Sequence, residues 1–417
     1  MLGAMGILVL FFLTEYLGIS PGIAGLLIFI SRLWDIVASL LVGQWSDRTQ
    51  SRWGRRVPFL VTGAPVAAAA YALLFLAPEG LSVVGLEAYI LLALILYASG
   101  YTLFVVPYLT VPAEITEIPQ QRTTMMSYRV VFMTVAGLNV AILGPVLIKA
   151  FGGGIAGYRG MGMVQGVIIL TAMWGCAWVV ARTPRIGRGT QPRTSLAAQM
   201  AIVLRNRPFL IFIGVKFFQL IAAATTTAAL LYLARYVLDQ DESFLIRFGV
   251  FQTAGTLLSL PAWSWLARRF GKRNTYMGAG FAYAMVALSW LLAYGGEPSW
   301  ATDIRLFLIG LGSAGLLVMG FSLLPDTMEH NTRSSGVAQE GILAAIYSMV
   351  EKGTAAFGPL VAGLLLEASG FISAAGGDLP PEQPQSAIIA MFLLAAVIPA
   401  ACNITGSLLL TRFHLTE

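Results

Sequence analysis

Almost the whole of this 417-residue chain consists of apolar runs separated by short polar connections. Each run has about the length that a membrane-spanning helix needs. A spanning helix takes roughly 20 predominantly apolar residues. Only 11% of the residues are charged, against about 25% in soluble domains. Because helices satisfy their own backbone hydrogen bonds inside a bilayer, the pattern predicts an all-α membrane protein. Twelve candidate spans fall at 2–17, 23–45, 58–77, 86–110, 123–149, 160–181, 208–236, 243–266, 276–294, 302–324, 341–367 and 387–411.

The connections between these spans alternate in charge. Those at 46–57, 182–207 and 267–275 hold four, six and four Arg or Lys residues. The connections at 18–22, 78–85, 295–301 and 368–386 hold none. Loops rich in Arg and Lys stay in the cytoplasm. The charge pattern therefore predicts a multi-pass protein of the lipid bilayer with both termini cytoplasmic.

The rest of the composition narrows the class of function. The net charge of +6 comes from short loops between apolar runs, so nucleic acid is not expected as a partner. The cysteines, Cys176 and Cys402, lie inside apolar runs, and the two histidines, His330 and His414, have no ligand partner at a useful spacing. No nucleophile–base pair or metal set occurs at depth. We therefore expect neither an enzyme nor a bound metal or cofactor.

The two halves of the chain, on either side of a central basic connection, also resemble each other. The segment SDRTQSRWGRR after the second span corresponds to ARRFGKRNT after the eighth. The segment VPAE after the fourth corresponds to LPDT after the tenth. Matches that recur in order indicate an internal repeat, a common plan among transporters. We predict a six-helix bundle at 1–181, a cytoplasmic linker at 182–207 and a second, pseudo-symmetric bundle at 208–417.

A few polar side chains lie deep inside the apolar runs. Asp35, between Trp34 and Ile36, is one of them. A charge there costs about 2.5 kcal/mol or more, so it needs a partner, a proton or a water-filled cavity. The structural alternative is a pair with Arg32, one turn away on the same helix. Lys216 and Gln219 share one face of the seventh span, where Lys216 either serves the solute or extends to the interface.

Three separated motifs resemble the major facilitator superfamily, and more narrowly its glycoside–pentoside–hexuronide:cation symporters, typified by the melibiose permease. They are RLWD followed by SDRTQSRWGRRVP within 32–58, PYLTVPAEIT with RTTMMSYR within 107–129, and PDTMEHNTRSSGVAQEG with EKGTAAFGP within 325–359. The resemblance covers nearly the whole chain. It implies twelve helices in two bundles, a solute cavity at the pseudo-twofold axis and alternating access. It also implies a bacterial inner membrane, a small-molecule solute and a monomer.

The resemblance places the coupling-cation site on the second and fourth spans. Asp35 matches the first carboxylate of the family's pair, Ser39 stands at the second position, and Thr102 matches the family's threonine. Val105 replaces a third acid. One charge and two hydroxyls give few ligands for Na⁺, because a hard cation needs several oxygen ligands. Burial disfavours the charged form of a lone carboxylate, so H⁺ is expected before Na⁺.

The resemblance also identifies solute-binding candidates, namely Tyr101, Arg129 and Lys352, to which Lys216 and Gln219 are added from their depth. Lys352 would neutralise Asp35 when no cation is bound. The family's first-span acid has no counterpart, since only 14 residues precede Glu15. We therefore expect the first helix to be truncated. With both sugar-binding acids missing, a simple galactoside is not the expected solute.

Charged residues at the cytoplasmic helix ends form a predicted gate. They match the superfamily's gate loop and its repeat in the second half, and their other role is to fix topology. The set is Asp47, Arg48, Arg52, Arg55, Arg56, Glu114, Arg333 and Glu340. Three functions remain open. The first is cation-coupled transport of a sugar or glycoside, and the second is transport of an amphiphile such as a lysolipid or uncoupled facilitation. The third is a membrane sensor, which would need an output domain, whereas the tail after Thr411 reads only RFHLTE.

Overall fold

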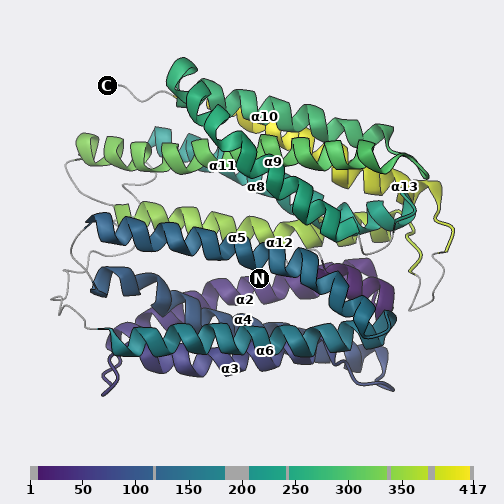
Figure 1. Ribbon diagram of the computed structural model, residues 1–417, viewed down its shortest axis with the longest axis horizontal. Helices are drawn as coiled ribbons and strands as arrows, with labels where there is room; N and C mark the ends of the chain where they lie inside the picture. Colours follow the sequence, from purple (N-terminus) through teal and green to yellow (C-terminus); the bar gives the residue numbers. More distant parts are fainter. Residues whose placement is uncertain are drawn as a thin grey trace. The chain divides into compact units, whose positions relative to one another are not determined.

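The computed structural model describes residues 8–115, 119–183, 206–240, 244–335, 340–373 and 381–413. Every regular element in these ranges is helical (Figure 1). The N-terminal half comprises η2 (Phe12–Tyr16), α2 (Pro21–Arg48), α3 (Val57–Phe75), α4 (Val83–Ile115), α5 (Pro119–Ala150) and α6 (Gly154–Arg182). The C-terminal half comprises α8 (Arg207–Tyr236), α9 (Phe244–Phe270), α10 (Lys272–Leu288), η3 (Ser289–Leu292), α11 (Ser299–Ser335), α12 (Glu340–Ala368), α13 (Gln385–Phe392), η4 (Leu393–Val397) and α14 (Ile398–Leu410).

These helices confirm the prediction of an all-α membrane protein. Among the described residues, nine helices are long and apolar enough to cross a bilayer. In α5, which begins with polar residues, Val135–Ala150 is a shorter apolar stretch among the described residues. The last predicted span is one continuous path through α13, the π-helical turn η4 and α14. Of the first predicted span, only residues from Leu8 onward are described, and they include the π-helical η2.

The chain forms two compact units. Unit 1 contains α2 to α6, and unit 2 contains α8 to α14 together with the described residues up to Phe12. Leu8–Phe12 falls in the second unit, where Phe11 packs edge-on against Tyr232 of α8 at 5.4 Å between ring centroids. The predicted bundle bounds stay a prediction. The predicted linker at 182–207 falls mostly on residues outside the described ranges and stays a prediction.

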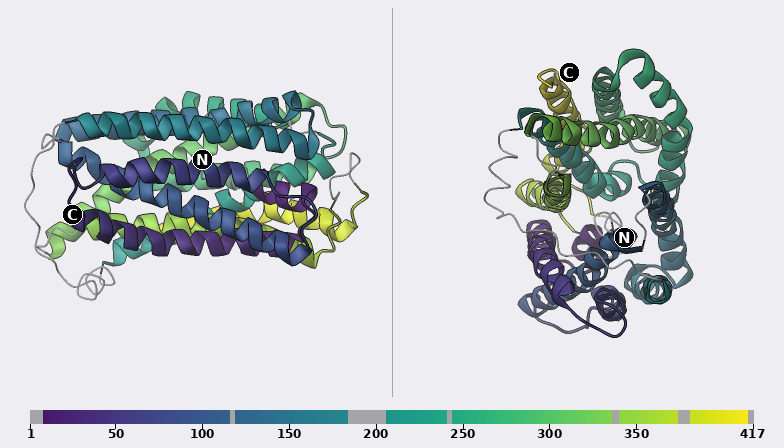
Figure 2. Two further views of the ribbon diagram at one scale, coloured as in Figure 1. Left: turned by 90° about the horizontal axis from the view of Figure 1, so that it is seen from below. Right: turned by 90° about the vertical axis from the view of Figure 1, so that its left-hand side faces the viewer.

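Each unit repeats the same helix pairings. In unit 1, α4 packs against α2 and α3, and α3 packs against α6. In unit 2, α11 packs against α9 and α10, and α10 packs against α14. Figure 2 shows the long helices of each unit from below and from one end. This recurrence is what an internal sequence repeat produces when both copies fold by the same contacts.

Small residues let the helices of a pair approach closely. On α9, a Cβ added at Gly255 would lie 2.0 Å from the Phe307 carbonyl oxygen of α11. Two side chains of α9 donate hydrogen bonds to α11 carbonyls, from Thr256 Oγ1 to Gly310 at 3.1 Å and from Trp263 Nε1 to Leu311 at 2.8 Å. Membrane helices associate through close packing of this kind, because lipid is as apolar as their side chains.

Charged side chains of unit 2 gather where α9 and α11 begin. Arg247 donates from Nε to Asp303 Oδ1 at 2.8 Å and from a terminal nitrogen to the Ser299 carbonyl at 2.5 Å. Glu297, whose side chain is 2% exposed, pairs with Arg305 and accepts from Thr302 Oγ1 at 2.6 Å. These bonds fix the loop between η3 and α11 to the first turns of α11.

Glu297 should make the stability of unit 2 sensitive to acid. Burial raises the pKa of its carboxyl, but hydrogen bonds from Arg305 and Thr302 and the Arg305 charge outweigh burial, so the pKa is lowered in the folded protein. A carboxyl whose pKa is lower in the folded than in the unfolded protein stabilises the fold at pH values above its unfolded pKa. This contribution is lost as the pH falls through the folded pKa. We expect Glu297→Gln to cost about 3 kcal/mol at neutral pH.

The measurement is thermal unfolding in detergent from neutral pH down to about pH 3, past the ordinary glutamate pKa. Wild type should lose stability in acid, whereas Glu297→Gln should be less stable at neutral pH and lose less in acid. Glu79→Gln is the control, because the pair of Glu79 with Arg159 is exposed, with 83% of the Glu79 side chain accessible. Equal effects of both variants would contradict the prediction.

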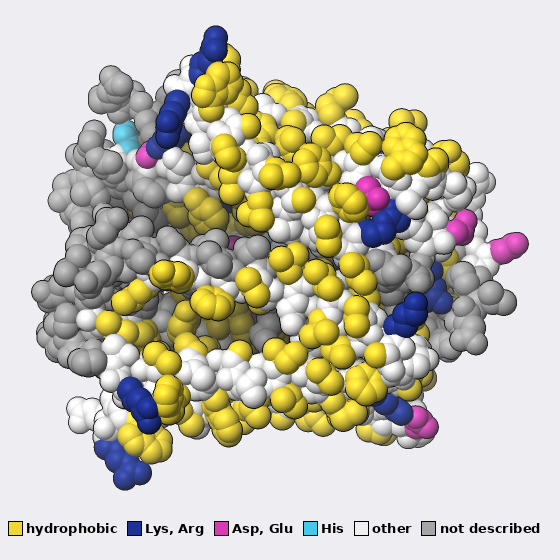
Figure 3. All heavy atoms as spheres, viewed as in Figure 1, with side chains coloured by type: hydrophobic (Ala, Val, Ile, Leu, Met, Phe, Trp, Pro, Cys, Tyr) yellow, Lys and Arg dark blue, Asp and Glu magenta, His cyan; other side chains and the backbone are white. Residues whose placement is uncertain are grey.

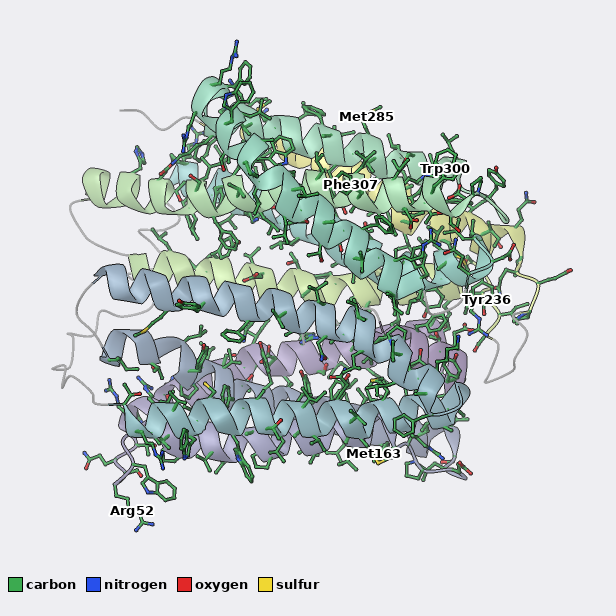
Figure 4. All side chains as sticks on the ribbon, in the orientation of Figure 1. Arg52, Met163, Tyr236, Met285, Trp300 and Phe307 are labelled. Atoms are coloured by element: carbon green, nitrogen blue, oxygen red, sulfur yellow. The ribbon has the colours of Figure 1, made fainter. Side chains whose placement is uncertain are left out.

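The helix surfaces suit a lipid environment. On the face drawn in Figure 3, hydrophobic side chains cover the middle of the helices and the described charges lie near their ends. Met163, Met285 and Trp300, labelled in Figure 4, are 49%, 69% and 66% exposed. Large apolar side chains so exposed on long helices belong against acyl chains. The chain is an integral membrane protein.

Candidate functional site

The predicted coupling residue Asp35 lies in the interior of unit 1, on α2. Its side chain is 2% exposed, and Arg32, one turn earlier, is 9% exposed. The hydroxyl of Thr102, on α4 and 1% exposed, donates a hydrogen bond to Asp35 Oδ1. The fold thus brings together two predicted site residues that lie 67 positions apart in the sequence. A buried carboxylate is thus joined to a hydroxyl donor across the α2–α4 interface.

Ser39, the third predicted member of the cation site, lies one turn after Asp35 and is half-buried. Its hydroxyl donates to the Asp35 backbone carbonyl oxygen at 2.7 Å. The hydroxyl proton is therefore held by the helix backbone, as is common for serine inside a helix. The Ser39 oxygen keeps its lone pairs, but it adds no charge to the site.

Two tyrosines precede Thr102 on α4. Tyr101, a predicted solute-binding residue, is half-buried and stacks on Tyr97, with ring centroids 6.2 Å apart and planes at 15°. Tyr97 is 2% exposed and lies within electrostatic range of Arg32 and Asp35. Its hydroxyl has no hydrogen-bond partner among the described residues. A buried hydroxyl without a partner is costly, and water or a bound molecule is the usual remedy.

A second hydrogen bond fastens α2 to α4 beside the carboxylate. Trp34 Nε1 donates to Ser99 Oγ at 2.8 Å. Trp34 precedes Asp35, and Ser99 lies one turn before Thr102, so the two bonds are neighbours on the same helix pair. Together they fix the position of α2 along the axis of α4, and this position holds Thr102 at the Asp35 carboxylate.

The structure describes one of the other two predicted solute-binding residues in full and the other only in part. The side chain of Arg129, on α5, lies outside the described part of the structure. Lys352, on α12, is half-buried and belongs to unit 2. The idea that Lys352 neutralises Asp35 stays a prediction.

Lys216 and Gln219 come together in unit 2, on one face of α8. Lys216 is 2% exposed and Gln219 is 9% exposed. Lys216 Nζ donates to Gln219 Oε1 at 2.5 Å, and Tyr276 of α10 donates its hydroxyl to the same oxygen at 2.6 Å. Lys216 therefore does not extend to the membrane surface, which was the structural alternative. It is enclosed with its ammonium group inside the unit.

The gate residues lie at the cytoplasmic end predicted for α2. Arg56 is 4% exposed and donates to Ser46 Oγ at 2.5 Å, which closes the loop onto the end of α2. Arg52 is exposed, stacks over the Trp53 ring at 5.1 Å and projects outward in Figure 4. Arg48 is exposed and Arg55 is half-buried. The side chains of Asp47, Glu114, Arg333 and Glu340 lie outside the described part, so their pairing stays a prediction.

Unit 2 contains an ion pair at the position that the internal repeat makes equivalent to this gate. Lys272, in the segment corresponding to SDRTQSRWGRR, lies 2.6 Å from Asp326 of the LPDT segment. Arg273 beside it donates from Nε to the Leu410 carbonyl at 3.0 Å, at the end of α14. The repeated loop therefore contacts two neighbouring helices of its own unit.

Some residues of these sites were not predicted from the sequence. In unit 1 they are Tyr97 and Ser99, and in unit 2 it is Tyr276. Helical spacing offered a signal for the first two, since Tyr97 lies four residues before Tyr101 and Ser99 three before Thr102. Tyr276 carried no such signal, because only the packing of α10 against other helices of unit 2 places it at Gln219.

Comparison with known proteins agrees with this architecture. The isoprimeverose transporter of Lactiplantibacillus pentosus is 27% identical, over 87% of this chain and 76% of its own. The putative glycoside/cation symporter YagG of Escherichia coli (strain K12) is 25% identical, over 98% of this chain and 87% of its own. The crystal structure of a D-xylose-proton symporter shares the fold, with a TM-score of 0.67 over 99% of this chain and 94% of its own at 13% identity. The family described as MFS/sugar transport protein matches residues 1–417, and this chain belongs to that family of membrane transporters.

Proposed function

We propose that this protein is a secondary active transporter that carries a sugar or glycoside across the bacterial inner membrane together with a proton. Family membership supports transport. The names of the relatives, an isoprimeverose transporter and a glycoside/cation symporter, support a sugar or glycoside over the amphiphilic alternative. Both termini are cytoplasmic in this proposal, as the loop charges predict.

The observation that carries the coupling proposal is the burial of Asp35 in α2, where the Thr102 hydroxyl donates to its carboxylate. A carboxylate in a bilayer-spanning helix is costly when charged. Protonation removes that cost, and Thr102 then keeps its hydrogen bond by donating to a carboxyl oxygen. Asp35 thus alternates between a neutral form, which tolerates a closed, dry interior, and a charged form, which favours access to water. Binding of a proton with solute biases the alternation between the two sides.

Sodium is the weaker candidate for the coupling ion. It needs several oxygen ligands in its first shell. In the described part of the site, Asp35 supplies one charge, Thr102 turns its proton toward that carboxylate, and the Ser39 proton is held by the backbone. A proton needs only the carboxylate oxygen itself. The site therefore fits H⁺ better than Na⁺.

The test is solute-induced proton movement in proteoliposomes of the purified protein, with a panel of glycosides and a parallel panel of lysolipids. We expect external alkalinisation when one glycoside is added, and the same response whether sodium or potassium is the bulk cation. A response to lysolipid only would reject the sugar assignment. Glycoside uptake that requires sodium and moves no protons would reject proton coupling but keep the sugar assignment.

A further inference from the structure

Two buried polar side chains of unit 1 lack hydrogen bonds to any described residue. One is Tyr97, which is 2% exposed and whose hydroxyl has no partner there. The other is Arg32, which is 9% exposed and takes part in no hydrogen bond or ion pair of the described residues. A guanidinium group has five N–H donors and a tyrosine hydroxyl has one. Because buried donors without acceptors are costly, both side chains call for a further partner.

Both side chains lie near the Asp35 carboxylate. Arg32 precedes Asp35 by one turn on α2, and the Thr102 hydroxyl of α4 donates to that carboxylate. Tyr97 lies on α4 just over one turn before Thr102, and it is within electrostatic range of both Arg32 and Asp35. The hydrogen bonds between α2 and α4 therefore bring two unused donors and one carboxylate to the same part of the unit.

The Tyr97 ring is held in place by its aromatic neighbours. It stacks on Tyr101, with ring planes at 15°, and it contacts Tyr71 of α3 with ring centroids 6.0 Å apart. The charged and titratable groups that act on Tyr97 are Arg32 and Asp35 of α2, Tyr71 of α3 and Tyr101 of α4 itself. A hydroxyl on a ring fixed in this way stays near the carboxylate.

The charges around this position select the kind of molecule that can occupy it. Asp35 repels an anion, and Arg32 repels a cation. A neutral molecule that both accepts and donates hydrogen bonds satisfies all three groups, and water is the smallest such molecule. Buried waters typically make about three hydrogen bonds to polar groups that lack other partners. Because part of Arg32 remains exposed, water has access to this side chain.

We infer that Arg32, Tyr97 and Asp35 together hold one buried water molecule, and that Tyr97 is a positioning residue for uptake of the coupled proton by Asp35. This role of Tyr97 rests on the proposed proton coupling at Asp35. The water accepts hydrogen bonds from Arg32 and Tyr97 and donates one to the carboxylate. A hydrogen bond to the charged form favours that form, so the Tyr97 hydroxyl opposes protonation of Asp35 through the water.

The experiment is an infrared pH titration of the purified protein in lipid, which needs no solute. The Asp35 carboxyl band is identified as the protonation band that is lost in Asp35→Asn. Tyr97→Phe keeps the ring and removes only the hydroxyl. We expect it to raise the pH midpoint of the Asp35 band by about one unit, as when a charged group loses one hydrogen bond.

A second band reports the water itself. When Asp35 takes up its proton, wild type should show a change in a water O–H band that shifts in H₂¹⁸O. Tyr97→Phe and Asp35→Asn should lack this change. Tyr71→Phe is the matched control, because it removes a buried hydroxyl of the same cluster whose contact is the Met161 sulfur at 3.9 Å. Its midpoint and its water band should equal those of wild type.

Each result leads to a definite conclusion. A wild-type midpoint in Tyr97→Phe, an equal shift in Tyr71→Phe, or no H₂¹⁸O-sensitive band in wild type overturns the inference and leaves proton coupling standing. If no carboxyl band of wild type is lost in Asp35→Asn, then Asp35 exchanges no proton, and the coupling proposal fails together with this inference. Thermal unfolding in detergent checks the fold of each variant. If Tyr97→Phe does not fold, the water band of wild type and its absence from Asp35→Asn decide the question.

Discussion

Asp35→Asn should uncouple transport from the proton gradient while leaving exchange of solute intact. One symported proton contributes about 2.3 kcal/mol at a membrane potential of 100 mV, which corresponds to roughly 50-fold accumulation of solute. An asparagine cannot take up the proton, yet its side-chain oxygen can still accept the hydrogen bond from Thr102. We therefore expect accumulation by the variant to fall to about the external concentration. The measurement is uptake of labelled solute at an imposed potential, beside equilibrium exchange.

Ser39→Ala is the matched control for this prediction, since Ser39 lies on the same face of α2 one turn further on. For a proton site the serine oxygen is dispensable, so Ser39→Ala should accumulate solute nearly as well as wild type. For a sodium site, loss of one oxygen from a small ligand set should weaken coupling strongly. Accumulation by Asp35→Asn equal to that of wild type would show that Asp35 has only a structural role.

Gly255→Ala should strongly destabilise unit 2, although it adds only one methyl group. The new methyl would lie 2.0 Å from the Phe307 carbonyl oxygen, a backbone atom of α11 that cannot rotate away. The helices must separate, which stretches the bonds from Thr256 to Gly310 and from Trp263 to Leu311. Overpacking and the weakened bonds together should cost about 3 kcal/mol or more. Thermal unfolding in detergent and the yield of folded protein measure the loss.

Gly278→Ala provides the comparison for this substitution. Gly278 lies in α10 of the same unit, and a Cβ there meets no atom within 4 Å. Alanine is preferred over glycine inside a helix by about 1 kcal/mol, so this variant should be as stable as wild type or slightly more so. If both variants lost stability equally, backbone propensity and not the contact between α9 and α11 would explain the effect at Gly255.

The helices themselves were readable from the sequence because each span must be apolar along its whole length. That requirement leaves a signal in the local sequence, so the predicted runs at 58–77 and 208–236 fall within a few residues of α3 and α8. The signal was weaker for α5, whose first turns are polar. The predicted span end at 324 agrees with the apolar part of α11, Ser299–Leu324. The helix itself continues to Ser335, since a helix that leaves the bilayer no longer needs apolar residues.

Individual site residues were identifiable where a charge or a family motif marked them, as at Asp35, Thr102 and Lys216. Their partners were much harder to find. Tyr97 and Tyr276 resemble ordinary apolar-face tyrosines, and nothing in their local sequence shows which helix they meet. The sequence is equally silent about which glycines lie at helix contacts. Gly255 and Gly278 look alike in the sequence, yet a Cβ at Gly255 would meet a backbone carbonyl, whereas a Cβ at Gly278 would meet no atom within 4 Å.

The sequence by itself determined that this chain crosses a membrane many times, that its halves repeat and that buried charges interrupt its spans. The spans and the charges within them are visible in a window of about 20 residues, the length that crosses a bilayer, and the repeat is visible as short motifs that recur in the same order. Only the tertiary structure decided that Thr102 meets the Asp35 carboxylate and that Gln219 and Tyr276 hold Lys216 inside unit 2. Such contacts join residues distant in the sequence, and the packing of one helix against another selects them.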